Sequence, residues 1–98
     1  MAGMRFSFTA ELWEWPGKGS WVFVTMPADA NDEIRAMPRP RRGFGSVRVQ
    51  ASIGDSTWST SIFPDSTRGY LLPVKRAVRA AEDVEPGEPA DITVELAE

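Results

Sequence analysis

The sequence predicts a mainly β protein, a single domain over residues 1–98 with six or seven strands and two short helices. Three observations predict this class. Apolar and polar residues alternate along several short segments, which is the period of a half-buried strand. Eight glycines and eight prolines separate these segments, and both residue types favour turns. Apolar residues recur at helical spacing in only two short segments, so strands should dominate the fold.

The chain should begin with a hairpin. Residues 6–12 alternate with their apolar side chains at even positions, so the even positions should face the core. Trp13 and Trp15 break this parity, which indicates either a bulge near the end of the strand or two indoles that cover the opposite face of the sheet. The turn at residues 16–19 then leads into a strand over 21–26, which is apolar on both faces and should be covered on both sides.

A short helix and a second hairpin should follow. A proline opens residues 27–37, which have the spacing of a short amphipathic helix. Residues 38–45 form a loop, because their two prolines cannot join a ladder or a helix interior. Residues 47–53 alternate as a clear amphipathic strand, and the Gly-Asp pair at 54–55 turns the chain into another strand over 57–62.

The last third of the chain should contain a turn, a helix and a final strand. Residues 64–69 include Pro, Asp and Gly, which favour a turn. A short apolar run at 70–72 precedes Pro73, which suits the first position of a helix because its missing N–H loses no helical bond. The exposed side of this helix would carry three basic residues, namely Lys75, Arg76 and Arg79. Residues 92–96 alternate again and form the last strand.

Two stretches share the same order of features. Residues 24–36 and residues 70–82 each run from a strand through an apolar residue and a proline into a short amphipathic helix. Such a repeat predicts two similar halves related by a pseudo-twofold axis. Coincidence is the alternative, because proline is common at the start of a helix.

Four motifs carry a resemblance to a known family. They are WVFV at 21–24 with Pro27, RGFG at 42–45, WSTSIFP at 58–64, and GYLLPVK at 69–75 with Val78-Arg79. Over residues 6–96 the chain resembles the small bacterial and archaeal proteins catalogued as domain of unknown function nineteen-oh-five. The resemblance implies a double-split β-barrel capped by two short helices, and some such proteins are joined to a YdeI-like bacteriocin-protection domain. The family has no established activity.

A second resemblance concerns the C-terminal part of the chain. Residues 72–88, which run from a Leu-Pro pair through an arginine-bearing helix to a Gly-acid turn, resemble the swapped-hairpin unit of the AbrB and MazE proteins. The usual Gly-Asp before the last strand is here Gly87-Glu88, followed by Pro89. This departure leaves the register of the last strand open.

The residues that the chain lacks narrow its chemistry. It contains no cysteine and no histidine, which excludes disulfides, thiolate metal sites, cysteine nucleophiles and the usual general base of a hydrolytic triad. We therefore expect no metal, no cofactor and no enzymatic activity. The net charge of -3 argues against a nucleic-acid binder that works through bulk charge. No segment could span a bilayer and no signal peptide opens the chain, so we expect a cytoplasmic protein. Arginine far outnumbers lysine, and alanine, glycine and proline are frequent, which suits a GC-rich bacterial genome.

Basic residues form the first candidate site. Three of them, Arg39, Arg41 and Arg42, precede the third strand. Lys75 and Arg79 stand one helical turn apart and could face one ligand. If the loop approaches this helix, the basic groups could bind a phosphate or a carboxylate. The alternative is an ordinary solvated face, balanced by the acidic residues between 82 and 88.

Aromatic residues form the second candidate site. Trp13, Trp15, Trp21, Trp58 and Tyr70 could line a cavity for a small molecule. In so small a barrel, side chains normally fill the interior, so core packing is the simpler interpretation. The sharpest hypothesis is a pocket at the second helix. Its predicted ligand-binding residues are Arg42, Trp58, Thr60, Ser61, Tyr70, Lys75 and Arg79.

We predict a non-enzymatic binding module for a small anionic ligand or a protein partner, acting through the basic helix and the aromatic strand. The alternative is nucleic-acid binding in the manner of AbrB. Its phosphate contacts would be Arg39, Arg41, Arg42, Arg48, Lys75, Arg76 and Arg79. An enzyme is the third class, since the hydroxyls at 57–61 would need Lys75 or a carboxylate as their base. AbrB-like chains need a partner chain to complete a barrel, whereas this chain could complete one alone, so we expect a monomer or weak dimer.

Overall fold

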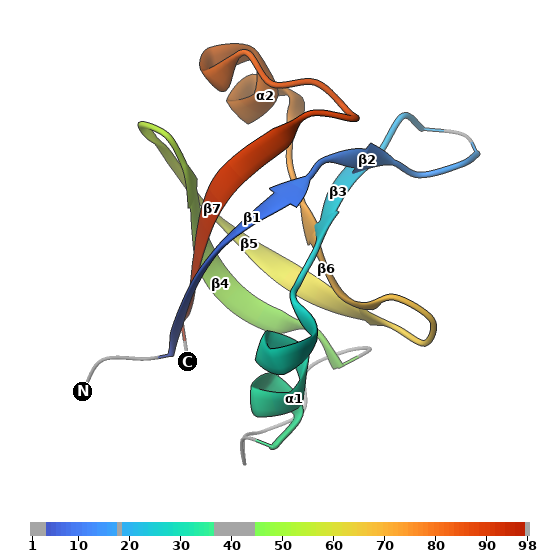
Figure 1. Ribbon diagram of the computed structural model, residues 1–98, viewed down its shortest axis with the longest axis vertical. Helices are drawn as coiled ribbons and strands as arrows, with labels where there is room; N and C mark the ends of the chain where they lie inside the picture. Colours follow the sequence, from blue (N-terminus) through green and yellow to red (C-terminus); the bar gives the residue numbers. More distant parts are fainter. Residues whose placement is uncertain (1–3, 18, 37–44, 98) are drawn as a thin grey trace.

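The computed structural model describes residues 4–17, 19–36 and 45–97, and within these residues the chain forms seven strands and two helices (Figure 1). The strands are β1 Arg5–Glu11, β2 Trp13–Glu14, β3 Val22–Thr25, β4 Val47–Ile53, β5 Ser56–Asp65, β6 Gly69–Pro73 and β7 Pro89–Leu96. The helices are α1 Ala28–Ala36 and α2 Arg76–Glu82. No helix in the described part of the chain is long and apolar enough to cross a membrane.

The seven strands form one antiparallel sheet in the order β1-β7-β4-β5-β6-β3-β2. Its two edge strands are consecutive in the chain, because only Leu12 separates β1 from β2. The N–H of Leu12 donates to the carbonyl of Glu88 at 3.0 Å, and the carbonyl of Leu12 accepts from the N–H of Gly87 at 2.7 Å. The chain itself thus joins the two edges, and the curled sheet forms the small barrel that the sequence predicts.

Two strands divide their pairing between partners, which splits the barrel into two layers. β5 pairs with β4 through residues 56–62 and with β6 through residues 63–65. The β1–β2 segment pairs with β7 as far as Glu11 and with β3 from Trp13 onward. The predicted class, a mainly β barrel of seven strands with two short helices, is therefore confirmed, while the likeness to AbrB and MazE stays a prediction.

The division of the first strand explains its break in parity. Leu12 is fully buried, while Trp13 pairs with Phe23 and both rings are only half-buried on the outer face of the sheet. Of the two alternatives, the structure therefore has indoles on the opposite face. The even positions at 6–10 are half-buried rather than buried, because β1 lies at an edge of the sheet.

The core lies on the inner face of the barrel. β4 buries every second residue from Val47 to Ile53, as its alternation predicts. Each fully buried aliphatic side chain contributes about 1.5–3 kcal/mol to folding. The largest of them are Leu12, Met26, Ile34, Ile62, Leu72 and Ile92.

The register of the last strand is settled by its two neighbours. Ile92 of β7 pairs with Phe8 of β1 on one side and with Ile53 of β4 on the other. Pro89 is the first residue of β7, which is the position in a strand that tolerates a missing N–H. The final strand is therefore three residues longer at its N-terminal end than its alternation predicts.

The strands of the two strand–proline–helix stretches lie side by side. β3 and β6 are antiparallel neighbours, and Thr25 pairs directly with Leu71. These two residues hold equivalent positions in the two stretches, so a local twofold axis passes through this pair. The chain leaves β3 for α1 at one end of the barrel and leaves β6 for α2 at the other (Figure 1).

The helix boundary predicted at Pro73 is wrong. Pro73 is the last residue of β6 and pairs with Phe23. The next N–H, that of Val74, donates to the carbonyl of Val22 at 2.9 Å and prolongs the ladder. Lys75 caps α2 in an extended conformation (φ -70°, ψ 159°), so the helix begins at Arg76. Proline favours the first position of a helix, but here the pairing of β6 with β3 keeps Pro73 and Val74 extended.

A buried amide fixes α1 on the sheet. Asn31 is 7% exposed; its Nδ2 donates to the carbonyl of Met26 at 3.3 Å, and its Oδ1 accepts from the N–H of Tyr70 at 3.1 Å. Gly69 has a φ of +86°, and a Cβ there would collide with the Asn31 amide. Sequence analysis assigned Gly69 to a turn and did not find Asn31. The pair closes this end of the barrel.

Candidate functional site

A cleft of about 450 Å³ opens where the barrel is split. Residues 56–62 of β5 pair with β4 along one edge, and β6 joins β5 only from Phe63 onward. The cleft lies between the first half of β5, the segment from Pro73 to α2, and the residues before β3. We call it the basic cleft. It is lined by Gly19, Ser20, Trp21, Val22, Trp58, Ser59, Thr60, Phe63, Pro73, Val74, Lys75, Arg76 and Arg79.

The structure brings together four of the predicted ligand-binding residues. Trp58, Thr60, Lys75 and Arg79 all line the basic cleft. Ser61 does not line it, and it pairs with Arg48 of β4.

Two further predicted residues do not contribute to the basic cleft. Tyr70 is 5% exposed and belongs to the core, and its backbone bonds place it beside α1, so its predicted position in this pocket is wrong. Arg42 lies outside the described residues.

Three cations form one wall of the cleft. Lys75 and Arg76 are exposed, and Arg79 is half-buried. The Nε of Arg79 donates to the carbonyl of Val74 at 3.1 Å, which fixes the guanidinium while its terminal nitrogens remain available as donors. In the described residues, an ion pair forms between Arg68 and Asp65, and neither residue lines the basic cleft. The cations of the basic cleft therefore lack a carboxylate partner within 4.0 Å in the described structure.

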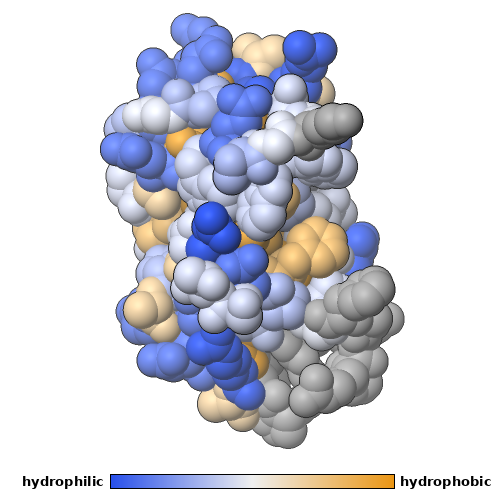
Figure 2. All heavy atoms as spheres, turned by 90° about the vertical axis from the view of Figure 1, so that its right-hand side faces the viewer, coloured by the Kyte–Doolittle hydropathy of each residue, from blue (hydrophilic) through white to orange (hydrophobic). Residues whose placement is uncertain are grey.

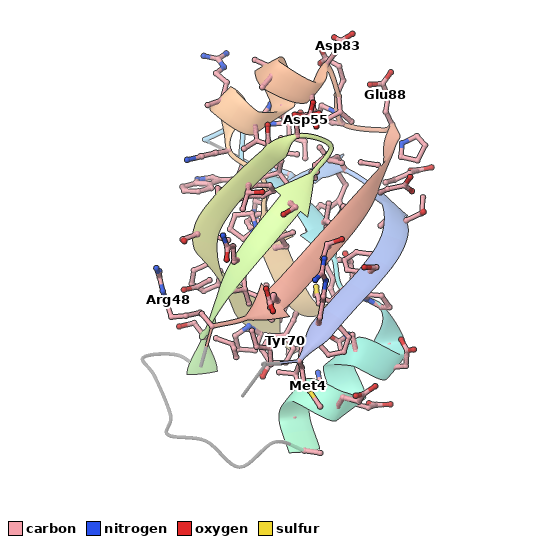
Figure 3. All side chains as sticks on the ribbon, turned by 90° about the vertical axis from the view of Figure 1, so that its left-hand side faces the viewer. Met4, Arg48, Asp55, Tyr70, Asp83 and Glu88 are labelled. Carbon is pink, nitrogen blue, oxygen red and sulfur yellow. The ribbon has the colours of Figure 1, made fainter. Side chains whose placement is uncertain are left out.

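Acidic residues near α2 line a different cavity. Glu82, Asp83, Glu88 and Asp91 contribute to a hollow of about 490 Å³ beside the start of β7, and Figure 3 shows Asp83 and Glu88 at that end of the molecule. The Oε2 of Glu82 accepts from Ser56 Oγ at 2.6 Å. The balancing carboxylates that sequence analysis considered thus do not line the basic cleft. No group of three or more acidic residues in the described chain could hold a metal ion.

An aromatic groove of about 420 Å³ adjoins the basic cleft. Trp21, Phe63 and Pro73 line both hollows and form the ridge between them. The remaining residues of the aromatic groove are Trp15, Phe23, Pro64, Asp65 and Leu71. Figure 2 looks at the side that carries the β2–β3 and β5–β6 hairpins, and hydrophobic atoms gather near the middle of that face beside hydrophilic ones.

The outer aromatic residues pack on each other rather than in the core. Trp13 and Trp15 lie 5.5 and 5.9 Å from Phe23, centroid to centroid. The guanidinium of Arg68 lies 5.1 Å from the centroids of both indoles, a favourable cation–π geometry. Leu71 is 5% exposed yet does not belong to the inner core, since it lies in the aromatic groove under this layer.

The prediction that the tryptophans pack in the core holds for Trp58 alone. Trp58 is 7% exposed, whereas Trp21 is 60% exposed. Phe63 is 43% exposed beside it in the cleft. The strand at 21–26 is thus covered by the core on one side and only partly by aromatic rings on the other, because no described helix lies over that face.

Backbone strain positions the exposed indole. Ser20 has a φ of 52°, in the left-handed region, and lines the cleft directly before Trp21. Gly19 has a φ of +100°, and a Cβ there would lie 2.8 Å from the Trp21 ring. The Trp21 ring stacks on Phe23 at 6.4 Å with an interplanar angle of 16°. Strained residues of this kind concentrate at functional sites.

One carboxylate near the aromatic groove has a shifted pKa. The backbone N–H of Arg68 donates to Asp65 Oδ2 at 2.8 Å and holds the pKa of the Asp65 carboxyl below its ordinary value. The N–H of Thr67 and the charge of Arg68 act in the same direction, while partial desolvation opposes them. Asp65 therefore stabilises the β5–β6 turn in its ionised form.

The residues of the nucleic-acid alternative are dispersed. Lys75, Arg76 and Arg79 lie together, but Arg48 lies near the other end of the barrel, away from α2 (Figure 3). The remaining members, Arg39, Arg41 and Arg42, lie outside the described residues. The described part of this set therefore forms one cluster and one isolated arginine.

Sequence analysis named Trp21 among the residues that could line a cavity, but it missed Phe63 and the ridge that the two residues form. The alternation of the strand could have revealed the ridge. Phe63 stands at an odd position, whereas the buried Trp58 and Ile62 stand at even positions of the same strand. Trp21 likewise precedes the buried Val22 and is out of phase with it. Large apolar residues at solvent-facing positions, one on β5 and one directly before β3, indicate a binding surface rather than a core.

Comparison with known proteins identifies the family of the chain but does not assign a function to it. The family model described as "Domain of unknown function (DUF1905)" matches residues 8–94. No curated protein matches the chain.

Proposed function

The chain belongs to the DUF1905 family of domains of unknown function, and we propose that it is a non-enzymatic binding module that takes a small anionic ligand in the basic cleft. One observation carries the proposal. Lys75, Arg76 and Arg79 line a concave site whose other residues are neutral, and no described carboxylate pairs with them. Cations that no described carboxylate neutralises in a hollow are available to a negatively charged ligand.

The surroundings of the cations strengthen their attraction for an anion. The cleft has an apolar floor that includes Trp58, Val74 and Pro73. Charges beside such walls are screened less than charges on an open surface. Its volume of about 450 Å³ falls in the range of about 300–1,000 Å³ that small-molecule sites occupy. Charge-assisted hydrogen bonds from arginine and lysine would supply most of the affinity.

A binding role accounts for the cleft better than an enzymatic one. Its hydroxyl groups belong to Ser20, Ser59 and Thr60. A hydroxyl becomes a nucleophile only beside a base, and Lys75 is the only amine among the lining residues. The lining contains donors and apolar surface, which are the components of recognition.

A protein partner is the second candidate, favoured by the aromatic groove. Trp21 and Phe63 are large, exposed apolar residues, and such residues are enriched at protein interfaces. Nucleic-acid binding in the manner of AbrB stays a prediction, as do a cytoplasmic location and a monomeric or weakly dimeric state. Sedimentation at several concentrations would measure that state.

A thermal-shift series tests the proposed function. The probes are inorganic phosphate, pyrophosphate, succinate, ribose 5-phosphate and a short DNA duplex. A probe at a hundred times its Kd should add about 2.7 kcal/mol, which raises the Tm of a domain of about 100 residues by about 10–20 °C. Lys75→Ala and Arg79→Ala should remove the shift, and Arg48→Ala, an exposed arginine at the other end, should keep it.

Either of two results would contradict the proposal. One is the absence of a shift with every anion. The other is an equal loss in Arg48→Ala and Arg79→Ala, which would mean a diffuse charge effect rather than a site. A shift with the duplex alone, steeply reduced by salt, would favour the nucleic-acid alternative.

A further inference from the structure

We infer that the ligand of the basic cleft is a nucleoside phosphate, whose base stacks on Trp21 and whose phosphate contacts Lys75, Arg76 and Arg79. The inference rests on the proposed function, because it names the ligand class of the same cleft. It goes beyond that function in assigning a role to the aromatic ridge.

The first observation is the exposed indole at the boundary of the cleft. The Trp21 ring lies nearly parallel to that of Phe23, with 6.4 Å between the centroids, and the residue is 60% exposed, so much of the indole faces water. Phe63, 43% exposed, lines the same cleft. A flat ring lying on Trp21 would cover apolar surface that otherwise faces water. Bases stack on aromatic side chains in this way, each contributing about 1–3 kcal/mol by alanine substitution.

The second observation is the amount of positive charge. Three cations occupy positions 75, 76 and 79, and the Arg79 guanidinium is held by its bond to Val74. A single carboxylate would neutralise one of them. A phosphate monoester carries about -1.5 to -2 charges at pH 7 and three acceptor oxygens, so it matches the cluster better. A planar aromatic carboxylate would use the ring surface and leave most of the charge unpaired.

The third observation concerns the polar residues that share the cleft with the ring and the cations. Ser20, Ser59 and Thr60 place hydroxyls in the same cleft. Hydroxyls both donate and accept hydrogen bonds, which suits the hydroxyls of a sugar. The base would stack on the indole, the sugar would form hydrogen bonds with side-chain hydroxyls, and the phosphate would bind the cations.

A base with a phosphate can come from a free nucleotide or from the end of a single strand. The aromatic groove shares Trp21, Phe63 and Pro73 with the basic cleft, so a second base could continue onto it. A dinucleotide that binds more tightly than a mononucleotide would indicate a strand as the source. Equal affinities would indicate the free nucleotide, and both results support the inference.

Titration calorimetry and tryptophan fluorescence test the inference on the whole chain. The probes are AMP, ribose 5-phosphate and the dinucleotide pApA. AMP should bind about 5- to 150-fold more tightly than ribose 5-phosphate, the equivalent of about 1–3 kcal/mol for one stacked base, and should quench the fluorescence. Trp21→Ala should remove this difference by lowering the AMP affinity to that of ribose 5-phosphate.

Two variants control the experiment. Trp21→Phe should keep part of the preference, since a smaller ring still stacks. Trp15→Ala removes an indole that lines the aromatic groove but not the basic cleft, so it should leave AMP binding unchanged.

Two results distinguish failure of the inference from failure of the proposed function. Equal affinities of the wild type for AMP and ribose 5-phosphate, both lost in Arg79→Ala, would overturn the nucleoside phosphate and leave the anion site in place. No binding of any anionic probe would overturn both.

Discussion

The two ends of the barrel are built from the same strand–proline–helix unit, yet one end is closed and the other is open. At the α1 end, the helix begins directly after Pro27, and Asn31 seals it to the sheet through Met26 and Tyr70. At the α2 end, Val74 and Lys75 remain extended before the helix, and the basic cleft lies beside them. The two extended residues before α2 thus distinguish the end with the basic cleft from the end that α1 closes.

This comparison predicts different costs at the two ends. Substitutions in the closed end should change stability and leave binding intact. Substitutions in the lining of the open end should change binding and leave stability nearly intact, unless the residue also belongs to the core.

The largest effect on stability should come from Trp58→Ala. Trp58 lines the basic cleft and also belongs to the core, at 7% exposure, as do the smaller Val22 and Val74. Removing a buried aromatic ring costs about 3–5 kcal/mol. Urea denaturation would measure the loss. A change within error would mean that the indole serves the cleft alone.

Asn31→Ala should have the next largest effect. It removes the acceptor of the Tyr70 N–H, which lies in the core, and the donor to Met26. An unsatisfied buried group costs about 1–3 kcal/mol. Anion binding should not change, because Asn31 lies at the other end of the barrel. Asp32→Ala, an exposed neighbour on α1, is the control and should stay within about 0.5 kcal/mol of the wild type.

Gly19→Ala should separate binding from stability at the open end. The φ of +100° and the approach of the new Cβ to Trp21 require the indole to move. We expect a loss of about 1 kcal/mol in stability, since left-handed backbone disfavours alanine. AMP affinity should fall to that of Trp21→Ala. An unchanged AMP affinity would mean that the aromatic ridge does not contact the ligand.

The smallest effect should be the pH dependence contributed by Asp65. Its pKa is lowered from an ordinary value of 3.8 in the folded state, so the carboxylate stabilises the fold above that value. The contribution is lost as the pH falls from about 3.8 through the lowered pKa. Urea midpoints of the wild type and Asp65→Asn should therefore differ at pH 6 and converge at low pH. A constant difference would contradict the role of ionisation.

Local pattern predicted the fold well, because strand period and turn residues are local properties. The alternation at 47–53, the division of the chain after residue 12 and the two helices were all visible in the sequence. The errors arose where a distant strand decides the outcome. Pro73 lies in β6 because it pairs with Phe23, fifty residues earlier in the chain.

The candidate site could be predicted only in part. Lys75 and Arg79 were found because a basic cluster is visible along one short segment. Tyr70 was misplaced, since adjacent apolar residues do not reveal which end of the barrel they reach. The exposure of Trp21 depends on the absence of a covering element over that face in the described structure, which no local pattern encodes.

The junction at Leu12 also governs the order in which the molecule can be made. β1 pairs with β7, so that Arg5 lies opposite Glu95, and among the described strands this pairing joins β1 to the sheet. During synthesis, β1 must therefore wait for β7, which follows it by about eighty residues. Contacts so distant in sequence form slowly, because the closure entropy of the intervening chain must be overcome first. Until β7 leaves the ribosome, the barrel stays open along the β4 edge that β7 later covers.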